Sequence, residues 1–340
     1  MISSSIDLPE IPGLLIRSHA GREDVAAMLA LHEACRVRDR IDLDSICYKT
    51  PNLSVERYAA EVEAGPEKAA VLVAESEGGP LLAHGWMEAW GIEERLYLWQ
   101  VWVHPEWRGR GIGTALLHWG ERRARELHGD DPRLALHLAN ATEGEADAVE
   151  LLRNEGYALN FVSPELSFDV LDAVQVPRVV EGIELRSLGA EEHRAVARAL
   201  SEANLNSPGQ EARWVGEALE QRIDAEEDEW LKRVANSDPA LGVVAWAGDE
   251  VAGAYLCGRS GEVGEIAQVA VRAPWRGRGV ARALAMQSLR GLRSAGCSGA
   301  RLFTSIGPDE VEPTEGPYAM YRKFGFVPIA RHLRFRKAMS

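Results

Sequence analysis

The sequence predicts an α/β fold (α+β, with a mixed sheet) that occurs twice along the chain. Three observations lead to this prediction: the length of the chain, an internal repeat, and the order of strands and helices in each half. The chain has 340 residues, of which 46% are hydrophobic. That length supplies two ordinary hydrophobic cores and is too great for one. We therefore expect two domains.

The internal repeat consists of three pairs of matching segments. The longest pair, VWVHPEWRGRGIG and VAVRAPWRGRGVA, is identical at seven of thirteen positions. The pairs are 13–18 with 182–187, 101–113 with 269–281, and 151–157 with 320–326. Chance matches would not keep a spacing of 168 or 169 residues at three sites, so the pattern indicates a duplication.

Each half begins with a short strand and a helix, at 22–35 and at 191–203. In the second half, LGVVAWAG and VAGAYLCGRS predict antiparallel strands around a turn at 248–249, and EIAQVAV predicts a further strand. After an arginine- and glycine-rich turn, apolar residues at helical spacing predict a helix over 280–295. The strand ARLFTSI, a last helix and the final strand VPIARHLRFRK complete a mixed sheet.

The repeat also sets the expected domain boundaries. We place an N-terminal domain at 12–170 and a C-terminal domain at 182–340. The proline-containing stretch 171–181 makes the natural linker between them.

Charge and composition restrict the class of partner. The formal net charge is −14, whereas nucleic-acid-binding proteins neutralise phosphates with clustered Lys and Arg, so we expect no nucleic-acid partner. An acidic field favours a cationic substrate such as an amine. No run of 18 apolar residues occurs, and the first residues lack the layout of a signal peptide, so we expect a cytoplasmic protein with no membrane partner.

The cysteines are scattered without metal-ligand spacing. We therefore expect neither a disulfide framework nor a metal site, and interpret them as small packing residues. They are Cys35, Cys47, Cys257 and Cys297.

The arginine- and glycine-rich turn is predicted to bind an anion. A strand enters it and a helix leaves it, so unsatisfied backbone N–H groups and roughly half a positive charge meet at the start of the helix. Glycines let a phosphate approach the backbone closely. The turn lacks Gly-Lys-Ser/Thr, and Thr114 and Arg282 stand where GxGxxG requires its third glycine. The missing motif residues therefore argue against nucleotide hydrolysis and against dinucleotide redox chemistry.

This arrangement resembles the GNAT acetyltransferase superfamily, whose acyl-CoA signature is Arg/Gln-x-x-Gly-x-Gly/Ala between the fourth strand and the third helix. The matches are Arg108-x-x-Gly111-x-Gly113 and Arg276-x-x-Gly279-x-Ala281. The resemblance covers nearly the whole chain, one copy in each half. It implies two tandem GNAT-type acyl-CoA N-acyltransferase domains, with acetyl-CoA as cosubstrate and no metal.

The resemblance also implies which residues bind the cosubstrate. Backbone groups of the strand before the turn would pair with the pantetheine arm, and one amide would polarise the acetyl carbonyl. In the second copy the implied residues are Val269, Val271, Arg276, Gly277, Arg278, Gly279, Val280, Ala281 and Arg282. In the first copy they are Val101, Val103, Arg108, Gly109, Arg110, Gly111, Ile112, Gly113 and Thr114.

Glu265 is the candidate general base. An alkyl amine has a pKa of about 10.4 and must be neutral to attack a thioester, so a base assists the reaction. Glu265 lies four residues before Val269, which resembles the place of the catalytic glutamate in the histone-acetylating branch of the family. An ordinary ion-paired strand glutamate fits the sequence equally well. The first copy has Tyr97 at this position.

Tyr321 is the candidate general acid for the departing CoA thiolate. It stands in Met-Tyr-Arg-Lys-Phe-Gly-Phe, which resembles the family pattern Leu-Tyr-x-x-x-Gly-Phe, although a half-buried packing tyrosine is the alternative. The first copy has Leu152 there, and leucine cannot donate a proton. Thr314 and Pro317 replace the usual asparagine and alanine of the family, which leaves the pantetheine contacts from that side open.

The leading hypothesis is an N-acetyltransferase that transfers an acetyl group from acetyl-CoA to the primary amine of a small molecule, with the active site in the second copy. The first copy is then degenerate, and either binds CoA structurally or closes the substrate pocket. Tandem members of the family suggest a sugar-linked or amino-acid amine as acceptor. The alternatives are a CoA-binding sensor or assembly module without turnover, a protein or peptide amine as acceptor, and a donor other than acetyl-CoA. No oligomeric state is predicted.

Overall fold

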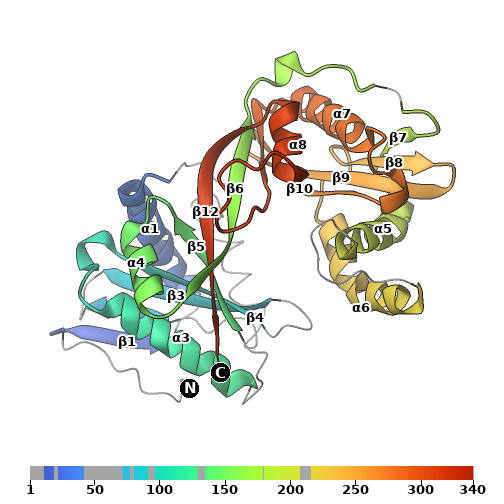
Figure 1. The fold of residues 1–340 in the computed structure, drawn as a ribbon. Helices are drawn as coiled ribbons and strands as arrows, with labels where there is room; N and C mark the ends of the chain where they lie inside the picture. Colours follow the sequence, from blue (N-terminus) through green and yellow to red (C-terminus); the bar gives the residue numbers. More distant parts are fainter. Residues whose placement is uncertain are drawn as a thin grey trace. The chain divides into compact units, whose positions relative to one another are not determined.

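The computed structural model describes residues 11–18, 22–41, 72–76, 80–90, 96–128, 135–178, 180–206 and 216–339, and Figure 1 shows the fold. The chain forms two compact units. Unit 1 comprises Met1–Glu165, Ser305–Val311 and Ala330–Ser340, and unit 2 comprises Leu166–Thr304 and Glu312–Ile329. Among the helices of the described ranges, none is both long and apolar enough to cross a membrane. Cys47 lies outside the described residues.

Unit 1 is an α/β unit whose strands follow the order β1-β2-β3-β4-β5-β12-β6. Its elements are β1 (Leu14–Ser18), α1 (Arg22–Asp39), β2 (Leu72–Ser76), β3 (Leu81–Trp90), β4 (Leu96–Val103), α3 (Ile112–His128), β5 (Ala135–Thr142), α4 (Ala146–Asn154), β6 (Ala158–Phe168) and β12 (Val327–Ala338). All described neighbours pair antiparallel except β4 and β5, which pair in parallel.

Unit 2 repeats this plan, with the strand order β11-β10-β9-β8-β7. Its elements are β7 (Glu184–Ser187), α5 (His193–Leu205), α6 (Gly216–Ala235), β8 (Val243–Ala247), β9 (Glu250–Ser260), β10 (Val263–Val271), α7 (Val280–Ser294), β11 (Gly299–Phe303) and α8 (Gly316–Phe324). Here β10 and β11 are the parallel pair. The predicted mixed sheet and tandem arrangement are therefore confirmed, as are the helices expected near 22–35, 191–203 and 280–295.

The two units do not follow the predicted boundaries 12–170, 171–181 and 182–340. The dividing line runs through β6 after Glu165 and through β12 before Ala330, so the last strand of the chain joins unit 1. There β12 pairs with β5, from His332 opposite Thr142 to Ala338 opposite Ala135. A strand belongs to the sheet that supplies its hydrogen bonds, and sequence position alone does not fix that sheet.

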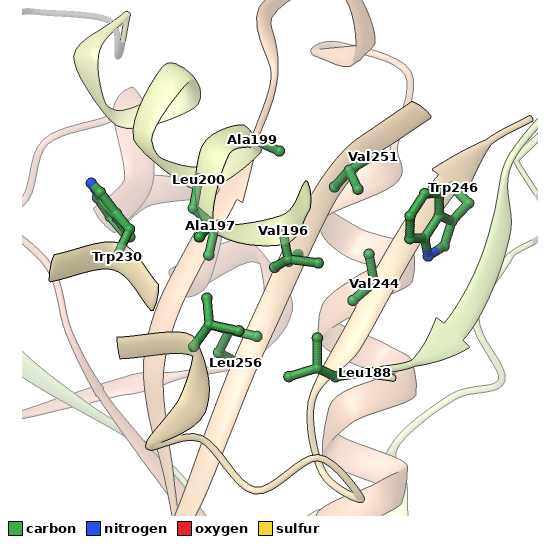
Figure 2. Close-up of a cluster of buried hydrophobic side chains, with 12 residues drawn as sticks. Leu188, Val196, Ala197, Ala199, Leu200, Trp230, Val244, Trp246, Val251 and Leu256 are labelled. Carbon is green, nitrogen blue, oxygen red and sulfur yellow. The ribbon is translucent and has the colours of Figure 1, made fainter. Parts of the chain in front are cut away.

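Each unit has a core on the face of the sheet covered by its first helices. In unit 1, Trp102 of β4 packs with Val25, Met28 and Leu31 of α1. In unit 2, side chains of α5 and α6 pack against those of β8 and β9. Figure 2 shows this cluster, with Leu200 and Trp230 from the helices and Leu256 from the sheet. Buried apolar residues recur along one side of α5, as a helical period of 3.6 residues predicts.

The core of unit 1 also contains two histidines. His32 and His84 are 0% exposed, their Nε2 and Nδ1 atoms lie 3.2 Å apart, and both rings contact Trp102. Burial lowers the pKa of His32 to about 3, so this ring is neutral at physiological pH.

Candidate active site

The two arginine- and glycine-rich turns have the same local geometry. Gly109 and Gly111 have φ of 73° and 84°, and Gly277 and Gly279 have φ of 73° and 88°. Only glycine adopts these angles without strain. A Cβ atom on Gly277 or Gly279 would meet no heavy atom within 4 Å, so the space above this backbone is open.

The first backbone N–H groups of the helix that follows each turn make no hydrogen bond within that helix. The first hydrogen bond of α3 runs from Ala115 N to Gly111 O, and that of α7 runs from Ala283 N to Gly279 O, each at 3.0 Å. The first amides of a helix lack intrahelical acceptors and carry the positive end of its dipole. Each turn therefore fits the pyrophosphate of a CoA thioester.

The first arginine of each turn donates hydrogen bonds to other elements of its own unit. The Nε atom of Arg276 donates to Val271 O at 2.8 Å, and its two Nη atoms donate to Asn206 O at 2.8 Å and Ala203 O at 3.0 Å, at the end of α5. Arg108 donates to Val103 O at 3.2 Å and to both carboxylate oxygens of Asp39, at 2.6 and 2.7 Å. The hydrogen bond from Asp39 raises the pKa of Arg108 further above its ordinary value.

The next arginines of each turn have a different environment. Arg110 stacks on Trp107 and Arg278 stacks on Trp275, with distances of 4.5 and 5.0 Å from the guanidinium carbon to the ring centroid. Both arginines are exposed. Arg282 lies 5.5 Å above the ring of Phe324. These arginines are exposed, whereas Arg108 and Arg276 are half-buried and bonded within their units.

The parallel strands β10 and β11 separate in front of the turn. Their pairing runs from Val263 opposite Gly299 to Ile266 opposite Leu302, and the described pairs end there. At the same point the register of β10 with β9 shifts between Ile266 and Gln268, which leaves Ala267 as a bulge. A bulge places one extra residue on its strand and reverses the alternation of side chains beyond it. Beyond Ile266, no described backbone pair joins β10 to β11.

The bulge puts Glu265 and Val269 on opposite sides of the sheet. A Cβ atom on Gly264 would lie 2.5 Å from Cδ1 of Leu292, so Gly264 faces α7, and its neighbour Glu265 faces the α5 and α6 side. Beyond the bulge, Val269 pairs with Tyr255. Leu256 packs in the core with α5 and α6, so Tyr255 and Val269 face α7. Glu265 is half-buried, opposite Gly258 of β9 and Arg301 of β11.

Tyr321 lies on α8, and its side chain is 5% exposed. Its ring makes edge contacts with Phe326 at 5.5 Å and Phe324 at 6.1 Å between centroids. Burial is the main cause that raises the pKa of the Tyr321 hydroxyl, and the Cys257 thiol nearby adds to it. Thr314 and Pro317, the two departures from the family pattern, are exposed before and at the start of α8.

Unit 1 contains a cavity of about 590 Å³ between β4, the turn, α3 and α4. Val101, Val103, Gly109 and Gly111 line it, so the predicted strand and turn residues of the first copy meet at one place. Its other lining residues include Cys35, Trp99, Gln100, Trp102, Arg108, Gly113, Thr114, Glu145, Asp147, Glu150 and Leu152. This cavity accommodates a ligand with an anionic group at the turn, while Leu152 offers no titratable group.

The fourth strand of unit 1 lacks the bulge of unit 2. Its register with β3 is unbroken from Trp90 opposite Leu96 to Ala83 opposite Val103. Because side chains alternate, Tyr97 faces the same side as Trp99, whose Nε1 donates to Leu116 O of α3 at 3.2 Å. Tyr97 and Glu265 therefore match in sequence but face opposite sides of their sheets.

Three features of these sites were not expected from the sequence. The bulge at Ala267 has no local sequence signal, because alanine and its neighbours suit a regular strand. Asp39 was not expected to bind Arg108, and Tyr255 was assigned only to a strand. A signal for Tyr255 exists in the sequence, since a tyrosine hydroxyl in a buried strand requires a partner.

Comparisons with known proteins give a consistent result. The model of the Acetyltransferase (GNAT) family matches residues 39–156 and 209–326. A mycothiol acetyltransferase of Nocardiopsis dassonvillei is 28% identical over 244 residues, which cover 67% of this chain and 70% of the relative. A mycothiol acetyltransferase of Thermobispora bispora is 25% identical over 247 residues, covering 69% of this chain and 74% of the relative.

Solved structures share the whole architecture. A GCN5-related N-acetyltransferase from Sphaerobacter thermophilus superimposes with a TM-score of 0.74 at 22% identity, covering 98% of this chain and 97% of that one. A tandem GNAT protein from the clavulanic acid biosynthesis pathway gives a TM-score of 0.69 at 16% identity, with coverage of 96% and 99%. At these identities the likeness establishes the fold.

Proposed function

The chain belongs to the acetyltransferase (GNAT) family of N-acetyltransferases, and from this premise we propose that unit 2 transfers an acetyl group from acetyl-CoA to the primary amine of a small molecule. The observation that carries the assignment to unit 2 is the bulge at Ala267, because it puts Glu265 on the opposite side of the sheet from Val269. The described part of β4 in unit 1 has an unbroken register instead.

In this proposal the turn of unit 2 binds the pyrophosphate of acetyl-CoA. The amides of Gly277 to Arg282 and the guanidinium groups of Arg278 and Arg282 hold the phosphates. Arg276 keeps the turn attached to β10 through Val271 O and to the end of α5 through Asn206 O and Ala203 O. When bound, acetyl-CoA supplies an acetyl group activated as a thioester. Backbone groups of Val269 and Val271 orient it.

Glu265 and Tyr321 divide the proton transfers between the two sides of the sheet. Glu265 faces the α5 and α6 side and takes a proton from the attacking amine, directly or through one water. Tyr321, on α8, donates a proton on the other side, where the thiol leaves. A base and an acid on opposite sides of the splayed strands suit a reaction in which the amine enters from one side and the thiol departs from the other.

A small-molecule acceptor is favoured over a protein amine. The curated relatives are named for acetylation connected with mycothiol, a small molecule rather than a protein. The negative charge of the chain also favours a cationic acceptor. The acceptor class is therefore proposed as an amine on a sugar-linked or amino-acid compound.

The cavity of unit 1 supports a second role, the binding of CoA without turnover. Its turn has the same glycine conformations as that of unit 2, and Val101 and Val103 line the cavity. At the positions that match Glu265 and Tyr321 in sequence, unit 1 has Tyr97 and Leu152. Unit 1 is then a structural or sensing CoA site.

The proposal is tested by a thiol-release assay with acetyl-CoA and a panel of small amines, peptides and lysine-containing proteins. Glu265→Gln should lower kcat/KM by about 10²–10⁴-fold, while calorimetry finds unchanged CoA binding. Glu262→Gln, at an exposed site near the same strand end, is the matched control and should retain turnover.

The paired variants Arg278→Glu and Arg110→Glu locate the active site, since each reverses the charge of an exposed arginine stacked on a tryptophan. We expect only Arg278→Glu to abolish turnover. Loss of turnover in Arg110→Glu alone would move the active site to unit 1. Absence of turnover with every amine, together with calorimetric CoA binding, would replace the enzyme by a CoA-binding sensor or assembly module.

A further inference from the structure

Tyr255, on β9, carries a buried hydroxyl that the fold does not satisfy. The residue is 0% exposed, and its Oη atom has no hydrogen-bond partner among the residues that the structure describes. A buried hydroxyl without a partner loses its hydrogen bonds to water without replacement, and folded proteins rarely retain one without a reason. A phenylalanine would fill the same space at lower cost.

The hydroxyl of Tyr255 belongs to the environment of the candidate acid. Tyr255 lies directly opposite Val269 and faces α7, the side on which α8 carries Tyr321. A negative charge on Tyr321 is felt at Tyr255, since it raises the pKa of the Tyr255 hydroxyl beyond the effect of burial.

Unit 1 fills the equivalent space differently. The residue opposite Val101 in unit 1 is Gly85, and a Cβ atom there would lie 2.3 Å from the indole of Trp99. This indole donates its N–H to Leu116 O, so it is a satisfied packing group. Unit 1 thus has a tryptophan with a partner and Leu152 on α4, whereas unit 2 has a tyrosine without one and Tyr321 on α8. The two hydroxyls occur together in one unit and are both missing from the matching positions of the other.

Burial makes Tyr321 a poor acid by itself. Its raised pKa means that the phenolate left after proton donation is costly in this apolar surrounding of Phe324 and Phe326. A donor close to the phenolate oxygen lowers that cost, and hydrogen bonds to charged groups are the strong ones. The hydroxyl of Tyr255 is a donor that has no acceptor among the described residues.

We propose that Tyr255 is a positioning residue of unit 2, whose hydroxyl donates a hydrogen bond to the Tyr321 oxygen, directly or across one water, when that oxygen gives up its proton. This inference rests on the proposed function. In the step concerned, the amine nitrogen has bonded to the acetyl carbon, the carbon–sulfur bond breaks, and its electron pair stays on sulfur. The proton of Tyr321 moves to that sulfur, which leaves as the thiol of CoA. The Tyr321 phenolate then recovers a proton from solvent.

The test combines Tyr255→Phe, Tyr321→Phe and the double variant, with kcat, KM and thermal unfolding measured for each. Tyr255→Phe should lower kcat about 10- to 100-fold, the effect of losing one hydrogen bond to a charged group. The KM for acetyl-CoA should change less than twofold. The Tm should stay the same or rise by about 2–4 °C, because the variant removes an unsatisfied buried hydroxyl. In the Tyr321→Phe background, Tyr255→Phe should cause no further loss.

Tyr318→Phe is the matched control, since Tyr318 is a buried tyrosine on the same helix and should keep full kcat. A Tyr255→Phe variant with unchanged kcat overturns the inference while the proposed function stands. A Tm that falls together with kcat assigns Tyr255 a packing role and overturns it as well, as does a double variant whose two losses multiply. If Tyr321→Phe itself retains full kcat, the acid in the proposed function is wrong.

Discussion

Two arginines in the turn of unit 2 have different roles: one stabilises the fold, and the other is proposed to bind phosphate. Arg276 and Arg278 are two positions apart and carry the same charge. Arg276 gives its nitrogen donors to three carbonyl groups, on β10 and at the end of α5, whereas Arg278 stacks on Trp275 at the surface. Arg276 therefore fixes the position of the glycines, and Arg278 adds positive charge at the surface beside them.

We expect substitutions of these two arginines to separate stability from affinity. Arg276→Ala should lower the free energy of unfolding by about 2–4 kcal/mol, since it leaves carbonyl groups of two elements without their charged donor. Arg278→Ala should change it by less than about 1 kcal/mol, because it loses only an exposed cation–π contact. Arg278→Ala should instead raise the KM for acetyl-CoA. Urea denaturation and initial rates measure both effects, and the opposite pattern would show that Arg276 is the phosphate ligand.

At the scale of elements, β10 positions the candidate base through its own irregularity. Before the bulge, Gly264 and Ile266 face α7 and Glu265 faces away; beyond it, Val269 faces α7. A regular strand would keep odd-numbered residues on one side, as β4 does in unit 1. The close contact of Gly264 with Leu292 fixes β10 against α7 at the position next to Glu265.

Two glycine substitutions test this packing. Gly264→Ala places a Cβ atom 2.5 Å from Leu292, which should lower the free energy of unfolding by about 1–3 kcal/mol through overpacking. Gly258→Ala is the control on the neighbouring strand β9, where a Cβ atom meets nothing within 4 Å, so stability should be unchanged or slightly higher. The double variant Gly264→Ala with Leu292→Ala should recover part of the strain. Equal stability of the two single variants would contradict the described contact.

At the scale of the whole molecule, the duplicated copies differ at the candidate site residues, and the boundary between the units lies within β6 and β12. Unit 1 keeps the turn and a cavity, while unit 2 keeps the candidate base and acid. The C-terminal part of β12 completes the sheet of unit 1, where Phe335 is 0% exposed and His332 lies 3.0 Å from Glu165, both side chains buried. The end of the chain therefore supports the N-terminal unit.

Core substitutions on either side of the boundary before Ala330 should destabilise different units. Phe335→Ala should destabilise unit 1 by about 3–5 kcal/mol, and Phe326→Ala, which removes a ring packed on Tyr321 and Phe168, should destabilise unit 2 by a similar amount. Hydrogen exchange resolved by residue measures this, with faster exchange in β5 for the first variant and in β9 and β10 for the second. Faster exchange confined to unit 2 in Phe335→Ala would contradict the place of β12.

The sequence by itself determined the duplication, the fold class and the two arginine- and glycine-rich turns. These features depend on local properties: helical periodicity in α7, and glycines at positions such as 277 and 279 that need positive φ. Only the tertiary structure decided where Glu265 points, what Arg276 contacts, and which unit receives β12. Each of these depends on residues far apart in sequence, such as Arg276 and Asn206, 70 positions away, or on a register shift that no single residue type specifies. The catalytic roles of Glu265 and Tyr321 stay predictions, and the variants described above test them.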